Sequence, residues 1–186
     1  RFEMRSDGLP ESTIYRIGSP PSKHSQYWLT ALPAIARPEA DDLLMIGLGG
    51  GVALEALLDT LATIDVIEIE PEVVAANDAL AELRRSNPFE DERIRLVIND
   101  ARSALSLTRK TYDIIVSQPS HPWTAGASHL YTREFLQLAK SHMNDNGVFL
   151  QWINAQYVNE ELLKTLAATM VDVFSSVRLY QPLPNV

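Results

Sequence analysis

The sequence has no cysteine among its 186 residues, which excludes disulfide bonds and thiolate metal sites. It also lacks an apolar run of the roughly 20 residues that a membrane-spanning helix needs. No signal peptide is visible, so we expect no membrane contact and a cytoplasmic location for this segment. The chain begins with Arg1 rather than Met, which indicates a piece of a longer protein.

Basic residues are scarce. Sixteen Lys and Arg stand against twenty-four Asp and Glu, which gives a formal net charge of −8. Because binding to nucleic acid or to an anionic membrane needs clustered cations, we expect no nucleic acid partner. No spacing of His, Asp and Glu indicates a metal site. The composition, 46% hydrophobic and 22% charged, is that of a globular protein with a packed core.

The pattern of apolar residues divides the chain into a short N-terminal β segment, residues 1–22, and a larger domain, residues 23–186. The N-terminal segment has two brief strands, residues 2–5 and 13–17, on either side of a turn at 6–10. A linker follows at residues 18–22. In the larger domain, strands alternate with helices, which predicts an α/β fold with a doubly wound, mostly parallel sheet. The expected strands are 43–46, 64–69, 94–98, 112–117, 148–153 and 177–180. The expected helices are 25–36, 52–58, one from Pro71, 132–143 and 159–174, with a turn at 144–147.

The helix from Pro71 is expected to be amphipathic. Proline fits the first helical turn, where no N–H is needed. Val73, Ala76, Leu80 and Leu83 follow at three- and four-residue steps, so we expect these four side chains to pack on the sheet.

Four glycines follow the first strand of the larger domain, at Gly47, Gly49, Gly50 and Gly51. Glycine permits positive φ angles and a close approach of the backbone to a ligand. The spacing is G-x-G-x-G rather than the G-x-G-x-x-G of dinucleotide sites, and it suits an S-adenosylmethionine-type ligand, which has no pyrophosphate. The alternative is a tight strand–helix turn that binds nothing.

Acidic residues end the next two strands. Glu68 and Glu70 end the second one, pointing to the same side, and an acid there binds ribose hydroxyls in nucleotide sites. We favour Glu68 for the ribose and Glu70 as its neighbour or as a partner of the helix dipole; two solvated surface acids are the alternative. Asp100, with Ala101 beside it, ends the third strand and can meet the adenine amino group. An ordinary helix N-cap is the other interpretation of Asp100.

These motifs resemble the spermidine/spermine synthase family, the polyamine aminopropyltransferases among the methyltransferase-like Rossmann folds. The segments that carry the resemblance are Leu32–Pro33, Ile46–Gly51, Val66–Val74, Ile98–Asp100, Tyr112–Val116 and Leu130–Phe135. The resemblance covers about residues 24–180. It implies decarboxylated S-adenosylmethionine as the donor, a diamine as the acceptor and methylthioadenosine as the product. It also implies a seventh, hairpin-forming strand that this chain does not reach. The N-terminal strands would be a remnant of the family's β-domain, which supports a homodimer.

Three positions depart from the family pattern. The family's D-S-S-D-P segment falls on Gln118–Pro122, so that Gln118 replaces the amine-activating aspartate and cannot take a proton. His121 replaces the second aspartate, which binds the polyamine. Gly50 replaces an aspartate whose charge would repel the carboxylate of intact S-adenosylmethionine, and its loss weakens that discrimination.

On the acceptor side, where the family's aspartates are replaced, the sequence has one histidine, His121. Imidazole is the side-chain type that ordinarily titrates near neutral pH. We predict that His121 acts as a general base on an amine or hydroxyl acceptor, with a turn histidine bonded to backbone as the alternative. Gln118 also falls where the N-P-P-Y motif of N-methyltransferases has an amide whose carbonyl holds the acceptor nitrogen. Trp123, His129 and Tyr131 are candidate walls of the acceptor pocket, although Trp123 and Tyr131 also suit the packing of a lid loop.

Three functions follow from the sequence. The first is a spermidine synthase-like transferase that moves an aminopropyl group to a polyamine amine. The second is a methyltransferase that uses intact S-adenosylmethionine on a small N or O acceptor and yields S-adenosylhomocysteine. The third is a catalytically degenerate binding or regulatory module, in which Glu68 and Asp100 matter while Gln118 and His121 do not.

Overall fold

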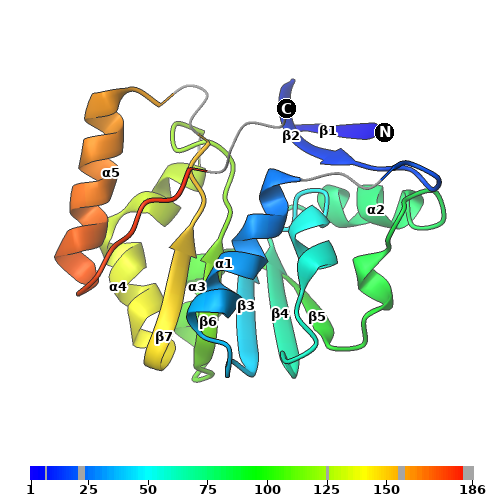
Figure 1. The fold of residues 1–186 in the computed structure, drawn as a ribbon. Helices are drawn as coiled ribbons and strands as arrows, with labels where there is room; N and C mark the ends of the chain where they lie inside the picture. Colours follow the sequence, from blue (N-terminus) through cyan, green and yellow to red (C-terminus); the bar gives the residue numbers. More distant parts are fainter. Residues whose placement is uncertain (7, 21–23, 125, 155–157, 182–186) are drawn as a thin grey trace.

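The computed structural model of the chain describes residues 1–6, 8–20, 24–124, 126–154 and 158–181 (Figure 1). A portion of the predicted linker, residues 21 and 22, and the predicted domain boundary after residue 22 lie outside these ranges. The strands are β1 (Phe2–Ser6), β2 (Leu9–Ile14), β3 (Asp42–Ile46), β4 (Thr63–Glu68), β5 (Ile94–Ile98), β6 (Tyr112–Ser117) and β7 (Met143–Gln151). The α-helices are α1 (Trp28–Ala36), α2 (Pro71–Ala79), α3 (Ala101–Leu107), α4 (Arg133–Ser141) and α5 (Glu160–Val173). Short 3₁₀ helices are η1 (Ser25–Tyr27), η2 (Val52–Ala56), η3 (Pro88–Glu90) and η4 (Ala127–Tyr131).

Five strands form one parallel sheet in the order β5-β4-β3-β6-β7. The chain leaves β3 for β4 on one side and later returns to β6 on its other side, so a topological switch point lies between β3 and β6. In open α/β sheets, ligands bind at this point, beyond the carboxyl ends of the strands. The predicted fold class, an α/β fold with a mostly parallel doubly wound sheet, is confirmed.

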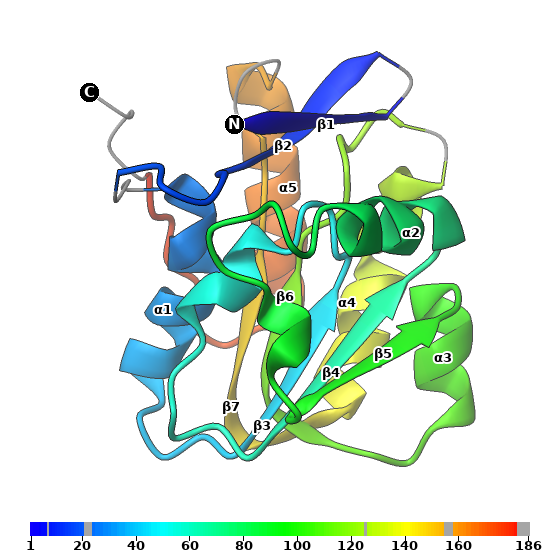
Figure 2. The same ribbon diagram turned by 90° about the vertical axis from the view of Figure 1, so that its right-hand side faces the viewer.

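Helices cover both faces of the sheet (Figure 2), and the residues of the central strands β3, β4 and β6 are therefore buried on both sides. Leu43, Met45, Ile64 and Val66 pack with α1 and η2 on one face. The other face carries Leu44, Ile46, Ile67 and Ile115, packed with α3 and with Phe135 of α4. Near-continuous apolar strands such as β3 and β6 are typical of a parallel sheet that is buried on both sides.

The N-terminal strands β1 and β2 form a separate antiparallel hairpin, which lies beyond the carboxyl ends of the sheet strands (Figure 1). The sequence predicts the second strand at 13–17, but it occupies Leu9–Ile14. The turn is therefore shorter than predicted, with Ser6 paired to Leu9. Proline at position 10 is tolerated because β2 has a partner on one side only.

At the amino edge of the sheet, Asp113 joins the starts of three strands. Its carboxylate accepts hydrogen bonds from the N–H groups of Asp41 at 2.9 Å and Asp42 at 3.3 Å. The side chain of Asn144 donates to it at 2.9 Å, and Arg37 forms an ion pair with it at 2.8 Å. This cluster lies opposite the glycine loop, at the other end of β3.

Three predicted elements differ from the structure. The strand expected at 177–180 is wrong, because these residues pair with no described strand, and a strand needs a neighbour for its N–H and C=O groups. The helix expected at 52–58 is only the 3₁₀ turn η2, which ends where Leu57 becomes extended. The turn expected at 144–147 is a bulge inside β7, where the register with β6 shifts and Asn146 has a φ of 61°.

The expected apolar face of α2 is also partly wrong. Val73 packs against the core, but Ala76 is exposed and so is Leu83 beyond the helix end. The fully buried side chains on this side are Asn77 and Arg84. Their place is explained by hydrogen bonds to the glycine loop, which a search for apolar spacing does not detect.

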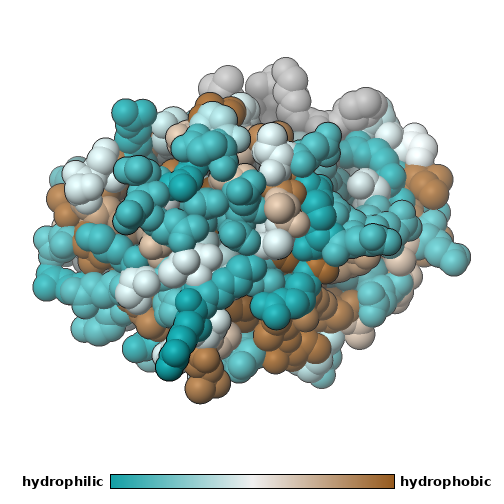
Figure 3. Space-filling view, turned by 90° about the horizontal axis from the view of Figure 1, so that it is seen from below, coloured by the Kyte–Doolittle hydropathy of each residue, from teal (hydrophilic) through white to brown (hydrophobic). Residues whose placement is uncertain are grey.

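The surface below the sheet, at the amino ends of its strands, is mostly hydrophilic with separate apolar patches (Figure 3). Among the described residues, no helix combines the length and the apolar character needed to cross a membrane.

Candidate functional site

The loop after β3 turns on its glycines. Gly47, Gly49 and Gly51 have φ angles of 87°, 51° and 68°, which residues with a Cβ rarely adopt. At Gly47 the space is closed as well, because a Cβ there would lie 2.7 Å from the carbonyl oxygen of Gln118. Gly47 thus lies close against the backbone that follows β6, and the approach of the loop to a ligand stays a prediction.

Gly50 faces the N-terminal hairpin. A Cβ at this position would lie 2.6 Å from the Ser12 Oγ and 2.9 Å from a side-chain carbon of Ile14. Ser12 is itself buried, and its hydroxyl donates to Gln26 Oε1 at 3.0 Å. Strand β2 thus occupies the space that any side chain at position 50 would need.

Glu68 is buried at the end of β4, with 7% of its surface exposed. Its Oε2 accepts the N–H of Leu48 at 2.8 Å, and its Oε1 accepts those of Ile69 and Glu70 at 2.9 and 3.0 Å. A carboxylate has about four acceptor positions, so Oε2 retains one for a ribose hydroxyl. The residue therefore fits the predicted ribose role.

The other acidic candidates lie at the same edge with different surroundings. Glu70 is exposed, lies beyond the end of β4 and precedes α2 without capping it through its side chain. Asp100 is the N-cap of α3, where its Oδ1 accepts the N–H of Ser103 at 2.8 Å. Ala101, the first residue of α3, is buried. Asp100 thus has the capping role that the sequence left open, next to the strand end where the adenine was expected.

Gln118 follows β6 and reaches back to the glycine loop. Its Nε2 donates to the carbonyl of Gly47 at 2.7 Å, and the carbonyl of Leu48 lies 3.5 Å away. The amide nitrogen is therefore bonded to the glycine loop, which is the predicted binding site of the S-adenosyl ligand, and is not available to an acceptor substrate.

His121 is buried, with 3% of its surface exposed. Its ring stacks on that of Trp123 with centroids 4.8 Å apart and planes 5° from parallel. Trp123 in turn has 45% of its surface exposed. The buried imidazole is therefore covered on one ring face by a partly exposed indole.

Tyr131 and His129 differ in burial. Tyr131 is buried, and its hydroxyl contacts the carbonyls of Ser120 at 3.1 Å and Trp152 at 3.2 Å. Burial raises the pKa of the Tyr131 phenol. This residue ties the segment after β6 to the end of β7, as expected for the packing of a loop. His129 is exposed, and its backbone carbonyl accepts the Thr132 hydroxyl at 2.8 Å.

The spermine/spermidine synthase domain matches residues 23–184 of this chain. The chain belongs to the spermine/spermidine synthase family. The resemblance found in the sequence is thereby confirmed.

Curated relatives carry the name polyamine aminopropyltransferase. Those of Escherichia fergusonii and Pseudomonas syringae pv. tomato are 28% and 27% identical over 155 residues, which is 82% of this chain and 54% of each relative. The chain thus spans about half the length of the curated relatives it matches.

Two solved structures share the fold. A spermidine synthase in complex with the transition-state analogue AdoDATO has a TM-score of 0.74 at 23% identity, over 81% of this chain and 52% of that one. The spermidine synthase of Thermotoga maritima gives 0.70 at 23% identity, over 81% and 51%. At this identity the comparison establishes the synthase fold.

Some residues around the glycine loop have no signal in the sequence. Ser12 closes the space at Gly50, and Asn77 and Arg84 bind carbonyls of the glycine loop. A buried Asn and a buried Arg seven residues apart, on one face of a helix and the turn after it, would be a usable signal. It becomes visible only once burial is known, because both residue types are usually exposed.

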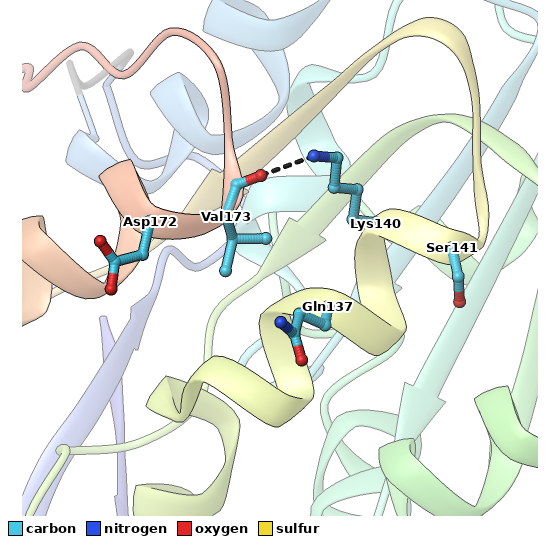
Figure 4. Close-up of a pocket in the computed structure, with 5 residues that line it drawn as sticks. All are labelled: Gln137, Lys140, Ser141, Asp172 and Val173. Carbon is cyan, nitrogen blue, oxygen red and sulfur yellow. Dashed lines mark hydrogen bonds between the residues drawn. The ribbon is translucent and has the colours of Figure 1, made fainter.

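A hollow of about 460 Å³ lies between α4 and α5 (Figure 4), and none of its lining residues belongs to the glycine loop. Lys140 and Val173 line it. Lys140 Nζ donates at 2.6 Å to the carbonyl of Val173, the last residue of α5. We assign this hollow to helix packing rather than to the site. Among the described residues, no three His, Asp or Glu side chains gather as metal ligands.

Proposed function

We propose that this chain is the nucleotide-binding portion of an aminopropyltransferase, which uses decarboxylated S-adenosylmethionine and a polyamine amine. The single observation that supports binding of the S-adenosyl donor is the way the glycine loop is held at its first peptide group, Gly47–Leu48. The N–H of this peptide donates to Glu68, and its carbonyl accepts from Gln118. The aminopropyl chemistry rests on family membership and on the names of the curated relatives.

In the proposed reaction the acceptor nitrogen forms a bond to the aminopropyl carbon next to the sulfonium. The C–S bond breaks, methylthioadenosine leaves, and the amine proton passes to a base. Glu68 would hold the ribose through its remaining acceptor position, and Asp100 would meet the adenine. Glycine at position 49, where a Cβ would meet no protein atom within 4 Å, would let the donor approach the loop without a side chain in the way.

The chain's own base for this proton would be His121. Its imidazole lies under Trp123, so the indole would shield the transferred proton from water. Gln118 would support the donor side of the site through its amide N–H, which is bonded to the Gly47 carbonyl. Trp123 and His129 stay candidates for the acceptor wall.

A second candidate function is methyl transfer from intact S-adenosylmethionine. It is favoured by the neutral residue at position 50, where β2 leaves no room for an acid. Without that charge the donor's carboxylate meets no repulsion at the loop.

Calorimetry with decarboxylated S-adenosylmethionine, the intact donor and methylthioadenosine separates these functions. We expect the decarboxylated donor and methylthioadenosine to bind more tightly than the intact donor. Tighter binding of the intact donor would favour methyl transfer, and no binding of any of the three would end the donor-site proposal.

The base is tested with the variant His121→Gln in an assay of putrescine-dependent methylthioadenosine release. General bases contribute about 10²–10⁴-fold, so a loss of that size with unchanged donor affinity is expected. Full activity of His121→Gln would contradict the assignment. A full-length protein that binds the donor but forms no product with any amine would indicate a binding or regulatory module.

A further inference from the structure

The buried face of α2 and of the turn that follows it is polar where it meets the glycine loop. Asn77 has 0% and Arg84 2% of their surface exposed. Both residue types are usually exposed, and when buried they are bonded to other groups. The contacts of these two side chains therefore explain why they are here.

Each of the two side chains holds one carbonyl of the loop. Asn77 Nδ2 donates to the Gly49 carbonyl at 2.8 Å, and Arg84 Nη2 donates to the Gly50 carbonyl at 2.9 Å. They also hold each other, since Arg84 Nη1 donates to Asn77 Oδ1 at 2.9 Å. Glu55 of η2 completes the group with an ion pair to Arg84 at 2.9 Å.

A planar trans peptide carries its C=O and its N–H on opposite sides. When Asn77 holds the Gly49 carbonyl, the N–H of Gly50 must point away from α2. When Arg84 holds the Gly50 carbonyl, the N–H of Gly51 must also point away from α2. This N–H donates to the Leu48 carbonyl at 3.0 Å and so closes the turn. Within the described ranges, the Gly50 N–H has no protein acceptor, so it is available to a ligand.

Stability alone is a weak reason for this arrangement. A buried ion pair such as Arg84–Glu55 contributes little net free energy of folding compared with apolar side chains of the same size. It does fix geometry, because a guanidinium with several bonded partners has one orientation. Here the partners are the loop carbonyls.

We propose that Asn77 and Arg84 are positioning residues of the donor site: they orient the Gly49–Gly51 peptides so that the Gly50 N–H faces the bound S-adenosyl compound. The proposal rests on the proposed function for the identity of that compound. The orientation of the loop itself does not depend on it.

Two substitutions in the full chain test the proposal. Asn77→Asp keeps the size and the acceptor for Arg84 but removes the donor to Gly49. Arg84→Lys keeps the charge beside Glu55, but its single nitrogen cannot occupy the positions of both Nη1 and Nη2. Matched controls are Asn87→Asp, with the same change of charge at the N-cap of η3, and Arg37→Lys, in the Asp113 ion pair at the amino edge of the sheet.

The first measurement is methylthioadenosine affinity by calorimetry, well below each variant's melting temperature. We expect Kd to rise about tenfold in Asn77→Asp and about fivefold in Arg84→Lys, as for a lost hydrogen bond. Both controls should stay within about twofold of the wild type, even where Arg37→Lys melts at a lower temperature. Wild-type affinity in Arg84→Lys would overturn the proposal, and this variant decides the matter if Asn77→Asp does not fold.

The second measurement is amide hydrogen exchange of the Gly49–Gly51 segment without ligand. Exchange should be faster in Arg84→Lys than in Arg37→Lys, and equal rates would overturn the proposal. If the wild type binds none of the S-adenosyl compounds, the proposed function fails, but this exchange comparison still tests the positioning of the loop.

Discussion

Gln118 and Glu68 hold opposite edges of the same peptide group. Gln118 donates to its carbonyl, that of Gly47, at 2.7 Å, and its N–H, that of Leu48, donates to Glu68 at 2.8 Å. The two side chains come from the ends of β6 and β4, the strands on either side of β3. The sheet order itself therefore fixes the first peptide of the glycine loop.

This relationship predicts that Gln118→Glu weakens donor binding. A carboxylate cannot donate to the Gly47 carbonyl, and an unpaired buried carbonyl costs about 1–3 kcal/mol. We expect methylthioadenosine affinity, measured by calorimetry, to fall by a comparable amount. Gln151→Glu is the control, since Gln151 bonds at the end of β7, to the carbonyls of Ser117 and Trp152. An unchanged affinity of Gln118→Glu would mean that Gln118 does not support the loop.

Removal of the Glu68 carboxylate should affect both stability and binding. Glu68→Ala leaves three backbone N–H groups without their acceptor. We therefore expect the free energy of unfolding, from urea titration, to fall by about 1–3 kcal/mol. Donor affinity should fall at the same time. Glu70→Ala, at an exposed position, should change neither quantity, and an equal effect of the two variants would move the ribose role away from Glu68.

The contact between the hairpin and the loop predicts a compensating pair of substitutions. Gly50→Ala places a methyl group 2.6 Å from the Ser12 Oγ, and overpacking of this kind costs about 1–3 kcal/mol. Ser12→Gly should recover some of this loss in the double variant. Thermal melting of the four proteins forms a double-mutant cycle. Strictly additive changes in the free energy of unfolding would show that β2 does not rest on Gly50.

The Asp113 cluster predicts a dependence of stability on pH. Burial alone would raise the pKa of Asp113, but hydrogen bonds from Asn144, Asp41 and Asp42 and the charge of Arg37 hold it below its ordinary value of 3.8. The unfolded chain thus binds a proton at higher pH than the folded one. The contribution of this group is complete above the unfolded pKa and is lost as pH falls through the folded one.

Melting temperatures measured from pH ~7 to ~2.5 check this dependence. Asp113→Asn should be less stable at neutral pH and lose less of its remaining stability below pH ~4 than the wild type. Asp172→Asn, at an exposed carboxylate, serves as the control. Parallel pH curves for wild type and Asp113→Asn would contradict the prediction.

The acceptor side shows where prediction from the sequence reached its limit. The position of Gln118 after a strand marks it as a site residue, but its partner, Gly47, is 71 residues away. The burial of His121 and its stacking on Trp123 likewise depend on how the segment after β6 folds back. The roles of His121, Trp123 and His129 in binding an acceptor stay predictions.

The sequence by itself determined the alternation of strands and helices, the parallel sheet, the glycine loop and the acidic strand ends, because these depend on local periodicity and on backbone freedom. Only the tertiary structure decided that β2 fills the space beside Gly50 and that Asn77 and Arg84 hold the loop. Such contacts join residues far apart in the chain, and their polar side chains are buried because each finds a specific partner. Hydrophobic spacing along the sequence carries no information about that pairing.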